Sequence, residues 1–181
     1  MKIFQKIQMA SEDVKSLLKT GVFYANGEVA ATHDGALVHV GDPVEHDLYS
    51  SMKDLNARKI EAVKAVDDKL MGFVDYVGVN QTDVMGVTYR IGDKTAGVAP
   101  VAGERIRVRI PALHDEFWLG VDNFKSEPSV GDFVVPTVGD TVLSVGSETS
   151  DGLCLKVEDT KTLITGQVND GKLYRCRVVS L

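Results

Sequence analysis

Residues Arg105–Ile110 read RIRVRI, a strict alternation of arginine with isoleucine or valine. Successive side chains of a β-strand point to opposite faces, so this pattern predicts a strand with one charged face and one apolar face. Further short apolar runs follow at regular spacing, namely EFWLGV, DFVVPTV, TVLSV, LCLKV, TLITGQV and LYRCRVV. Strands repeated in this way are typical of a β-sandwich or a β-barrel.

Seven adjacent glycine–aspartate pairs punctuate the chain between its short apolar runs. Glycine takes positive φ without steric cost, and aspartate bonds its own local backbone, so such pairs end one strand and begin the next. The chain is therefore predicted to be mainly β, built of antiparallel β-sandwich or barrel modules with at least eight strands.

Two short α-helices are also expected, over residues 12–19 and 47–56. Ser11 is a candidate N-cap for the first helix, and acidic residues follow it in the first turn, where the helix dipole favours them. For the second helix the signal is a set of apolar residues at helical spacing: Leu48, Met52 and Leu55.

The chain divides into three predicted segments. Residues 1–20 form an N-terminal arm with a short helix, residues 21–100 a β-rich domain with one helix inserted, and residues 101–181 an antiparallel β-sandwich or barrel. The boundary is placed near residues 97–103 because GVAPVAG contains two glycines, one proline and otherwise small or branched residues.

The composition is that of a core-forming globular protein. The chain has 181 residues, of which 44% are hydrophobic and 25% are charged, enough for one large or two small domains. Its net charge of −6 argues against nucleic acid as a partner. No apolar stretch approaches the ~20 residues of a membrane helix, so no membrane partner is expected. Cys154 and Cys176 lie in strand-like runs, and we expect buried free thiols.

No catalytic, metal or cofactor site is predicted. The Gly-x-Ser-x-Gly elbow of serine hydrolases and the glycine-rich phosphate loops are absent. The histidines between residues 33 and 46 lie beside acidic residues but lack the spacing of zinc ligands. The alternative is a small β-barrel enzyme that uses Asp115 or Glu116 with His114.

Arg105, Arg107 and Arg109 are candidate interface residues. Strand geometry places them on one face, roughly 7 Å apart. They either pair with acidic neighbours in their own sheet or meet carboxylates of another subunit, where the planar guanidinium binds well. Nucleic acid is disfavoured here because acidic residues separate the aromatic residues that follow.

Trp118 is a second candidate interface residue. In a regular strand Phe117, Trp118 and Leu119 cannot all face one core. If Trp118 points outward, its large apolar surface suggests a partner, although a bulge or packing at a sheet edge would also explain it.

The N-terminal segment supplies three more candidates, Ile3, Phe4 and Ile7. Large apolar side chains are poorly placed in water, so we expect residues 1–10 to lie across a neighbouring subunit as an arm. The alternative is that the segment folds back as an edge strand of its own sheet.

Three stretches, VMGVTYRIGDKTAG, IRVRIPALHDEFWLGVDNF and SVGDFVVPTVGDTVL, resemble virion structural proteins of tailed bacteriophages. The similarity is to head-associated or capsid decoration (cement) proteins and spans roughly residues 21–145. It implies a non-enzymatic auxiliary protein, made in the host cytoplasm and located in the virion, that binds and stabilises the major capsid lattice. The implied partners are the major capsid protein, neighbouring virion subunits and further copies of the chain, with no cofactor. The alternative is a β-sandwich module of a head fibre or tail component that recognises host-surface carbohydrate through Trp118 and nearby acids.

Overall fold

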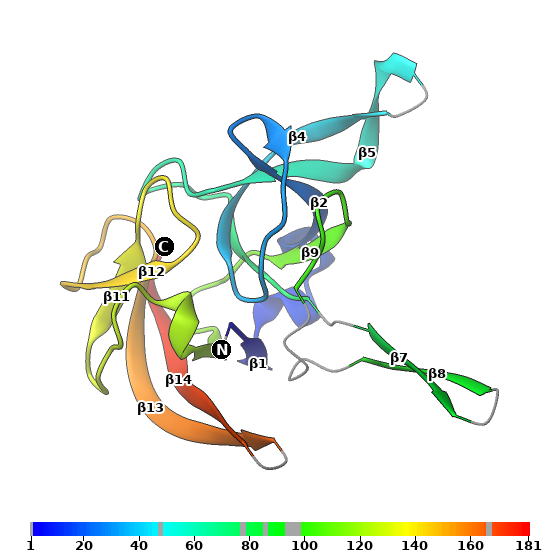
Figure 1. Cartoon of the computed structure of the whole chain (residues 1–181). Helices are drawn as coiled ribbons and strands as arrows, with labels where there is room; N and C mark the ends of the chain where they lie inside the picture. The colour runs from blue at the N-terminus through cyan, green and yellow to red at the C-terminus, as the bar shows by residue number, and fades with distance from the viewer. Residues whose placement is uncertain (1, 47–48, 77–78, 85–86, 93–98, 166–167) are drawn as a thin grey trace.

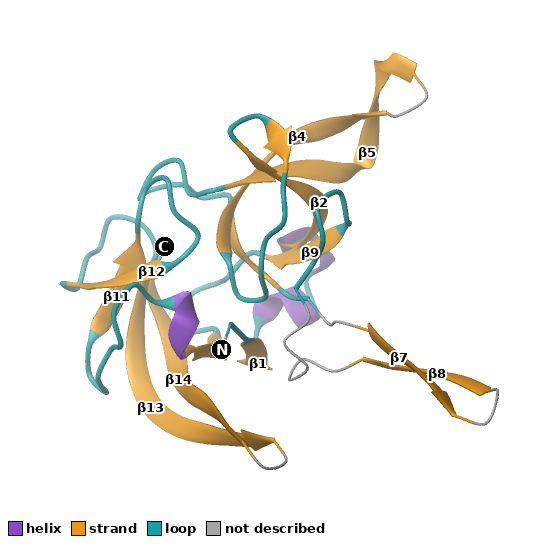
Figure 2. Ribbon diagram, in the orientation of Figure 1, coloured by secondary structure: helices purple, strands orange, loops and turns teal. Residues whose placement is uncertain are grey.

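The computed structural model describes residues 2–46, 49–76, 79–84, 87–92, 99–165 and 168–181. The prediction of a mainly β protein is confirmed, because these residues contain fourteen strands and their helical segments are short 3-10 turns (Figures 1 and 2). Most strands belong to two six-stranded sheets.

The first sheet is open and antiparallel, with the strand order β1-β10-β14-β13-β11-β12. Its strands are β1 (Phe4–Gln8), β10 (Glu116–Gly120), β11 (Phe133–Pro136), β12 (Leu143–Gly146), β13 (Cys154–Thr165) and β14 (Val168–Ser180). The N-terminal strand β1 and strand β12 are its two edges, and the long β13–β14 hairpin extends beyond them (Figure 1).

The second sheet closes on itself. Its order is β3-β2-β5-β4-β6-β9, and β9 also pairs with β2, so that five of the strands form a small barrel. The strands are β2 (Leu18–Ala25), β3 (Glu28–Val29), β4 (Leu37–His46), β5 (Tyr49–Glu61), β6 (Met71–Val74) and β9 (Ile106–Arg109). Only the β2–β5 pair is parallel among the pairings described for this sheet.

A separate hairpin projects from this body (Figure 2). It consists of β7 (Val79–Val84) and β8 (Val87–Gly92), which pair with each other and with no other strand of the described residues. The β4–β5 hairpin likewise reaches away from the barrel (Figure 1).

The start of β4 and the whole of β6 are buried on both faces, and this joins the two sheets. Leu37 and Phe73 belong to a large apolar cluster shared with the open sheet, whereas their neighbours Val38 and Val74 belong to the cluster of the barrel strands. The alternation of side chains along a strand sends adjacent residues to different cores.

Three phenylalanine rings lie at the centre of the shared core. Phe4 of β1 stacks on Phe73 of β6, with ring centroids 5.8 Å apart. Phe117 of β10 lies 5.3 Å from the first ring and 4.8 Å from the second. The N-terminal strand therefore completes the core between barrel and sheet.

The predicted helix over residues 12–19 is wrong. The structure has two separate 3-10 turns, Ala10–Glu12 and Lys15–Leu17, and strand β2 begins at Leu18. Ser11 does not cap a helix, since it is buried and its hydroxyl accepts a hydrogen bond from Arg109. The helical signal was weak because so short a segment depends on its tertiary contacts.

The predicted helix over residues 47–56 is also wrong. Residues 47 and 48 lie outside the described residues, and residues 49–56 belong to strand β5. This strand pairs antiparallel with β4 and, near its end, parallel with β2. Over residues 49–56 the pairing described is with β4 alone, and these backbone hydrogen bonds between strands override the helical spacing of the apolar residues.

Both sheets take strands from more than one predicted segment. Strand β1, from residues 1–20, joins the strands of residues 101–181 in the open sheet. Strand β9 comes after the predicted connection and closes the barrel. Within that connection, residues 97 and 98 lie outside the described residues.

The position of Phe4 yields a stability prediction. Phe4→Ala removes a fully buried ring, so we expect the free energy of unfolding to fall by about 3–5 kcal/mol in urea denaturation. Ile7→Ala is the matched control on the same strand; its side chain is 41% exposed, and we expect a change within about 0.5 kcal/mol. Equal effects of the two substitutions would contradict this placement of β1.

Candidate functional site

The N-terminal candidates are placed within the chain's own open sheet. Ile3 and Phe4 are buried, whereas Ile7 is exposed. The backbone N–H of Ile3 donates to Asn123 Oδ1 at 3.0 Å, and that of Phe4 donates to Asp34 Oδ2 at 2.8 Å. The segment is thus the edge strand of the alternative expectation, with two of its three apolar side chains enclosed by the same chain.

The three arginines do not share one environment. Arg105 and Arg107 are exposed, whereas only 4% of Arg109 is exposed. Arg109 Nε donates to Asp75 Oδ2 at 2.7 Å, and its Nη1 donates to Ser11 Oγ at 3.2 Å. Arg109 therefore joins the barrel to the 3-10 turn beside β1, which leaves Arg105 and Arg107 on the surface.

The proposed acid–base group does not assemble. One carboxylate oxygen of Asp115 accepts the backbone N–H of Ala10 and the other accepts an N–H of its own loop, each at 2.8 Å. Glu116 forms an ion pair with Arg175. His114 is exposed at positive φ, with no hydrogen bond or ion pair to either carboxylate in the described structure.

The histidines have separate partners. Burial lowers the pKa of His33, whose ring nitrogens contact the Asp34 carbonyl and the Thr141 hydroxyl. His39 Nδ1 is hydrogen-bonded to Asp68. Within the described part of the chain, no three His, Cys, Asp or Glu side chains are grouped so that they could hold a metal ion.

Both cysteines are buried and free, as predicted. Burial, together with the negative charge of Glu158, raises the pKa of the Cys176 thiol. A thiol that stays protonated at neutral pH is a poor nucleophile, so Cys176 acts as a small apolar core residue.

Trp118 lies on the face of the open sheet opposite the shared core. Phe117 and Leu119 are buried, and Trp118 between them is half-buried on the other side of β10. Lys161 Nζ lies 4.2 Å from the centroid of the Trp118 ring, a cation–π contact, and donates to Gln5 Oε1 at 3.3 Å.

Ion pairs continue this surface along β14 and β13. Arg175 is paired in register with Trp118, and its guanidinium binds Glu116, a contact that raises the pKa of Arg175. Arg177 binds Glu158 in the same way. We call this surface the Trp118 face; it comprises Gln5, Glu116, Trp118, Glu158, Lys161, Arg175 and Arg177.

The ion pairs of the Trp118 face contribute little to the stability of the fold. Ion pairs between partly exposed groups typically contribute 0–1 kcal/mol, because both partners are well solvated when apart. What they do provide is order, since each long side chain is held in a defined position beside the ring. The arrangement can present a half-buried aromatic ring and charges of both signs to a partner.

The arginines of the Trp118 face were missed in the sequence, although a signal for them exists. The run LYRCRVV, residues 173–179, alternates arginine with buried residues just as RIRVRI does. Lys161 has no comparable signal, since only the pairing of β13 with β14 and of β14 with β10 brings it to Trp118.

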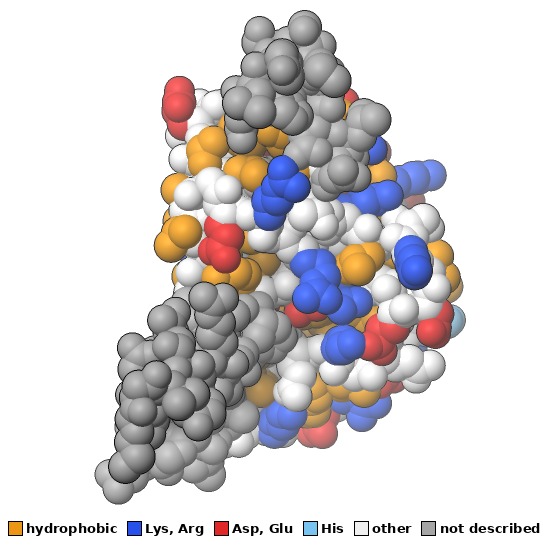
Figure 3. Space-filling model, turned by 90° about the vertical axis from the view of Figure 1, so that its right-hand side faces the viewer, with side chains coloured by type: hydrophobic (Ala, Val, Ile, Leu, Met, Phe, Trp, Pro, Cys, Tyr) orange, Lys and Arg blue, Asp and Glu red, His pale blue; other side chains and the backbone are white. Residues whose placement is uncertain are grey.

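Charges of both signs also occur on the face shown in Figure 3. Lys and Arg side chains gather across its middle, with acidic and apolar side chains around them.

Comparison of the chain with models of protein families, with curated proteins and with solved structures found no match. In the described residues no helix has the length and apolar character needed to span a membrane.

The buried ion pair can be tested by denaturation. Arg109→Ala leaves the Asp75 carboxylate buried without this partner, so we expect a loss of about 3–5 kcal/mol in the free energy of unfolding. Arg107→Ala, two residues away on the same strand and exposed, should change it by no more than about 0.5 kcal/mol. A small effect of Arg109→Ala would show that the pair is dispensable.

The contact between Lys161 and Trp118 can be followed by fluorescence, because Trp118 is the single tryptophan. Lys161→Met removes the cation above the ring, so we expect an altered emission spectrum and a loss of about 1 kcal/mol or less in stability. Lys156→Met is the control, since Lys156 lies over Phe133 in the same sheet and should leave the emission unchanged. An unaltered spectrum in Lys161→Met would contradict the contact.

Proposed function

We propose that this chain is a non-enzymatic structural protein of a tailed-phage particle, which binds the major capsid lattice and stabilises it. The observation that supports this best is the Trp118 face. Tryptophan and arginine are enriched at protein–protein interfaces, and they supply a large share of the residues that dominate binding energy. The sequence resemblance to head-associated and decoration proteins supports the same assignment.

The side chains of the Trp118 face are held in defined positions, which suits binding to a protein partner. Lys161 and Gln5 hold one another beside the ring, and the two arginines are held by carboxylates of the same sheet. Side chains that are already restrained lose less conformational entropy on binding, so such a surface binds more tightly for a given area. A carbohydrate ring stacking on Trp118 would have to displace Lys161.

The projecting hairpins support an assembled state. A two-stranded hairpin is at best marginally stable in water on its own, and β7–β8 pairs with no further strand of the described chain. We therefore expect neighbouring subunits, including copies of the same chain, to pack against it. In this proposal the open sheet and the barrel form a sandwich-like body from which the hairpins reach adjacent subunits.

Co-sedimentation with capsids that lack the protein tests the proposal. We expect the purified chain to pellet with the capsids, and Trp118→Ala to weaken binding at least about tenfold, as for a central interface residue. Tyr24→Ala is the matched control: Tyr24 is also a half-buried aromatic residue beneath a lysine, Lys59, but it lies on the barrel.

Three outcomes distinguish the alternatives. Failure of the unmodified chain to pellet would overturn the proposed function. Full binding by Trp118→Ala would exclude the Trp118 face as the contact. A glycan-array signal that disappears in Trp118→Ala, without capsid binding, would assign the face to host-surface carbohydrate.

A further inference from the structure

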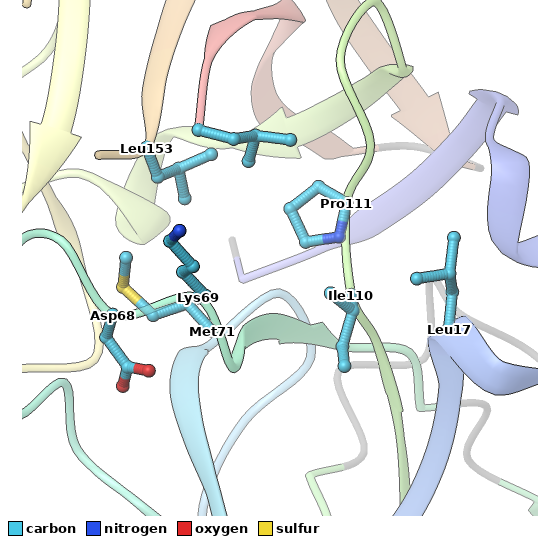
Figure 4. A pocket seen from close by; sticks show the side chains of 8 residues that line it. Leu17, Asp68, Lys69, Met71, Ile110, Pro111 and Leu153 are labelled. Atoms are coloured by element: carbon cyan, nitrogen blue, oxygen red, sulfur yellow. The ribbon is translucent and has the colours of Figure 1, made fainter. Parts of the chain in front are cut away.

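A cavity of about 380 Å³ lies where the barrel meets the open sheet (Figure 4). Its lining comes from the ends of four strands, since Met71 begins β6, Ile110 follows β9, Leu153 precedes β13 and Leu181 follows β14. Met71, Ile110 and Leu153 are buried, together with Pro111. The cavity thus has apolar walls that continue into the shared core.

Two charged residues of opposite sign lie beside these walls, and their environments differ. Asp68 is engaged elsewhere, because its carboxylate is hydrogen-bonded to His39 and accepts the N–H of Leu70 at 2.9 Å. Figure 4 shows the Asp68 carboxylate directed away from the cavity and the Lys69 amine directed into the space near Met71. Lys69 is exposed and forms no ion pair with the described residues, so its ammonium is the charged side-chain group that is both unpaired and directed into the cavity.

We propose that this cavity binds a small amphipathic carboxylate, with its apolar body against Met71, Ile110 and Leu153 and its carboxylate on Lys69 Nζ. The volume of 380 Å³ lies in the range of small-molecule sites. A cavity of about 150 Å³ already holds a benzene ring, so there is room for on the order of a dozen non-hydrogen atoms. The site lies apart from the Trp118 face, and the inference goes beyond the proposed function.

The charge defines the class of ligand. A carboxylate can accept a charge-assisted hydrogen bond from the Lys69 ammonium, a contact about twice as strong as one between neutral groups. An alcohol of the same length retains only the apolar contacts and a neutral hydrogen bond. A quaternary ammonium of the same length places like charges together.

Isothermal titration calorimetry with decanoate, decanol and decyltrimethylammonium, each below its micelle concentration, tests the inference. We expect saturable one-to-one binding of decanoate, weaker binding of decanol and none of the ammonium compound. Lys69→Gln should weaken decanoate binding about twofold to fivefold while leaving decanol unaffected, the range that a contact with an exposed charge supports. Lys64→Gln is the matched control, because Lys64 pairs with Glu61 and does not line the cavity.

Methyl NMR locates the ligand independently of affinity. With ¹³C-labelled methionine methyls, decanoate should shift the Met71 resonance and leave Met9, which lies in the core but does not line the cavity, in place. The assignment would be overturned by any one of three results: no saturable binding of decanoate, an unshifted Met71 signal, or an equal loss of affinity for decanoate and for decanol in Lys69→Gln. Capsid co-sedimentation of Lys69→Gln should be unchanged, so this inference and the proposed function fail separately.

Discussion

The buried carboxylate of Asp34 connects parts of the chain that are far apart in sequence. Its Oδ2 accepts the N–H of Phe4 at the start of β1, and its Oδ1 accepts the N–H of Tyr76 beyond β6, each at 2.8 Å. Its backbone carbonyl accepts a hydrogen bond from Asn123 Nδ2, and Asn123 Oδ1 in turn accepts a hydrogen bond from the N–H of Ile3. A buried carboxylate is costly unless it is fully hydrogen-bonded, so these contacts must form together. Barrel, edge strand and open sheet are coupled at this point.

The coupling explains why glycine follows Asp34. Gly35 has φ of +75°, and a Cβ at this position would lie 2.5 Å from Asn123 Nδ2. A second close approach occurs at Gly72 in β6, where a Cβ would lie 2.6 Å from a Val108 methyl and 2.7 Å from the Arg109 carbonyl. The absence of a side chain lets β6 lie against β9 and so helps the barrel to close.

Closure of the barrel also decides which of its arginines is buried in an ion pair and which stays exposed. Because β9 pairs with β2 and β6 at once, Arg109 is drawn in beside Asp75 and the first 3-10 turn, whereas Arg107 stays at the surface. In the open sheet, by contrast, one side of the strands remains uncovered by the barrel, and there the arginines of β14 meet carboxylates around Trp118. The same alternating pattern thus gives a structural ion pair in one sheet and a candidate binding surface in the other.

Local patterns in the sequence were enough to predict the mainly β class and the strand at RIRVRI, and to show that Phe117, Trp118 and Leu119 cannot all face one core, because side-chain alternation and turn chemistry act over a few residues. They left open which of these three side chains points outward. They could not predict that residues 49–56 form a strand, that Phe4 enters the core, or that Lys161 covers Trp118. Each of these depends on pairing between distant segments: β5 with β4 and β2, β1 with β10, and β13 with β14. Periodicity specifies which residues share a face, whereas hydrogen bonds and packing between strands far apart in the chain decide what that face meets.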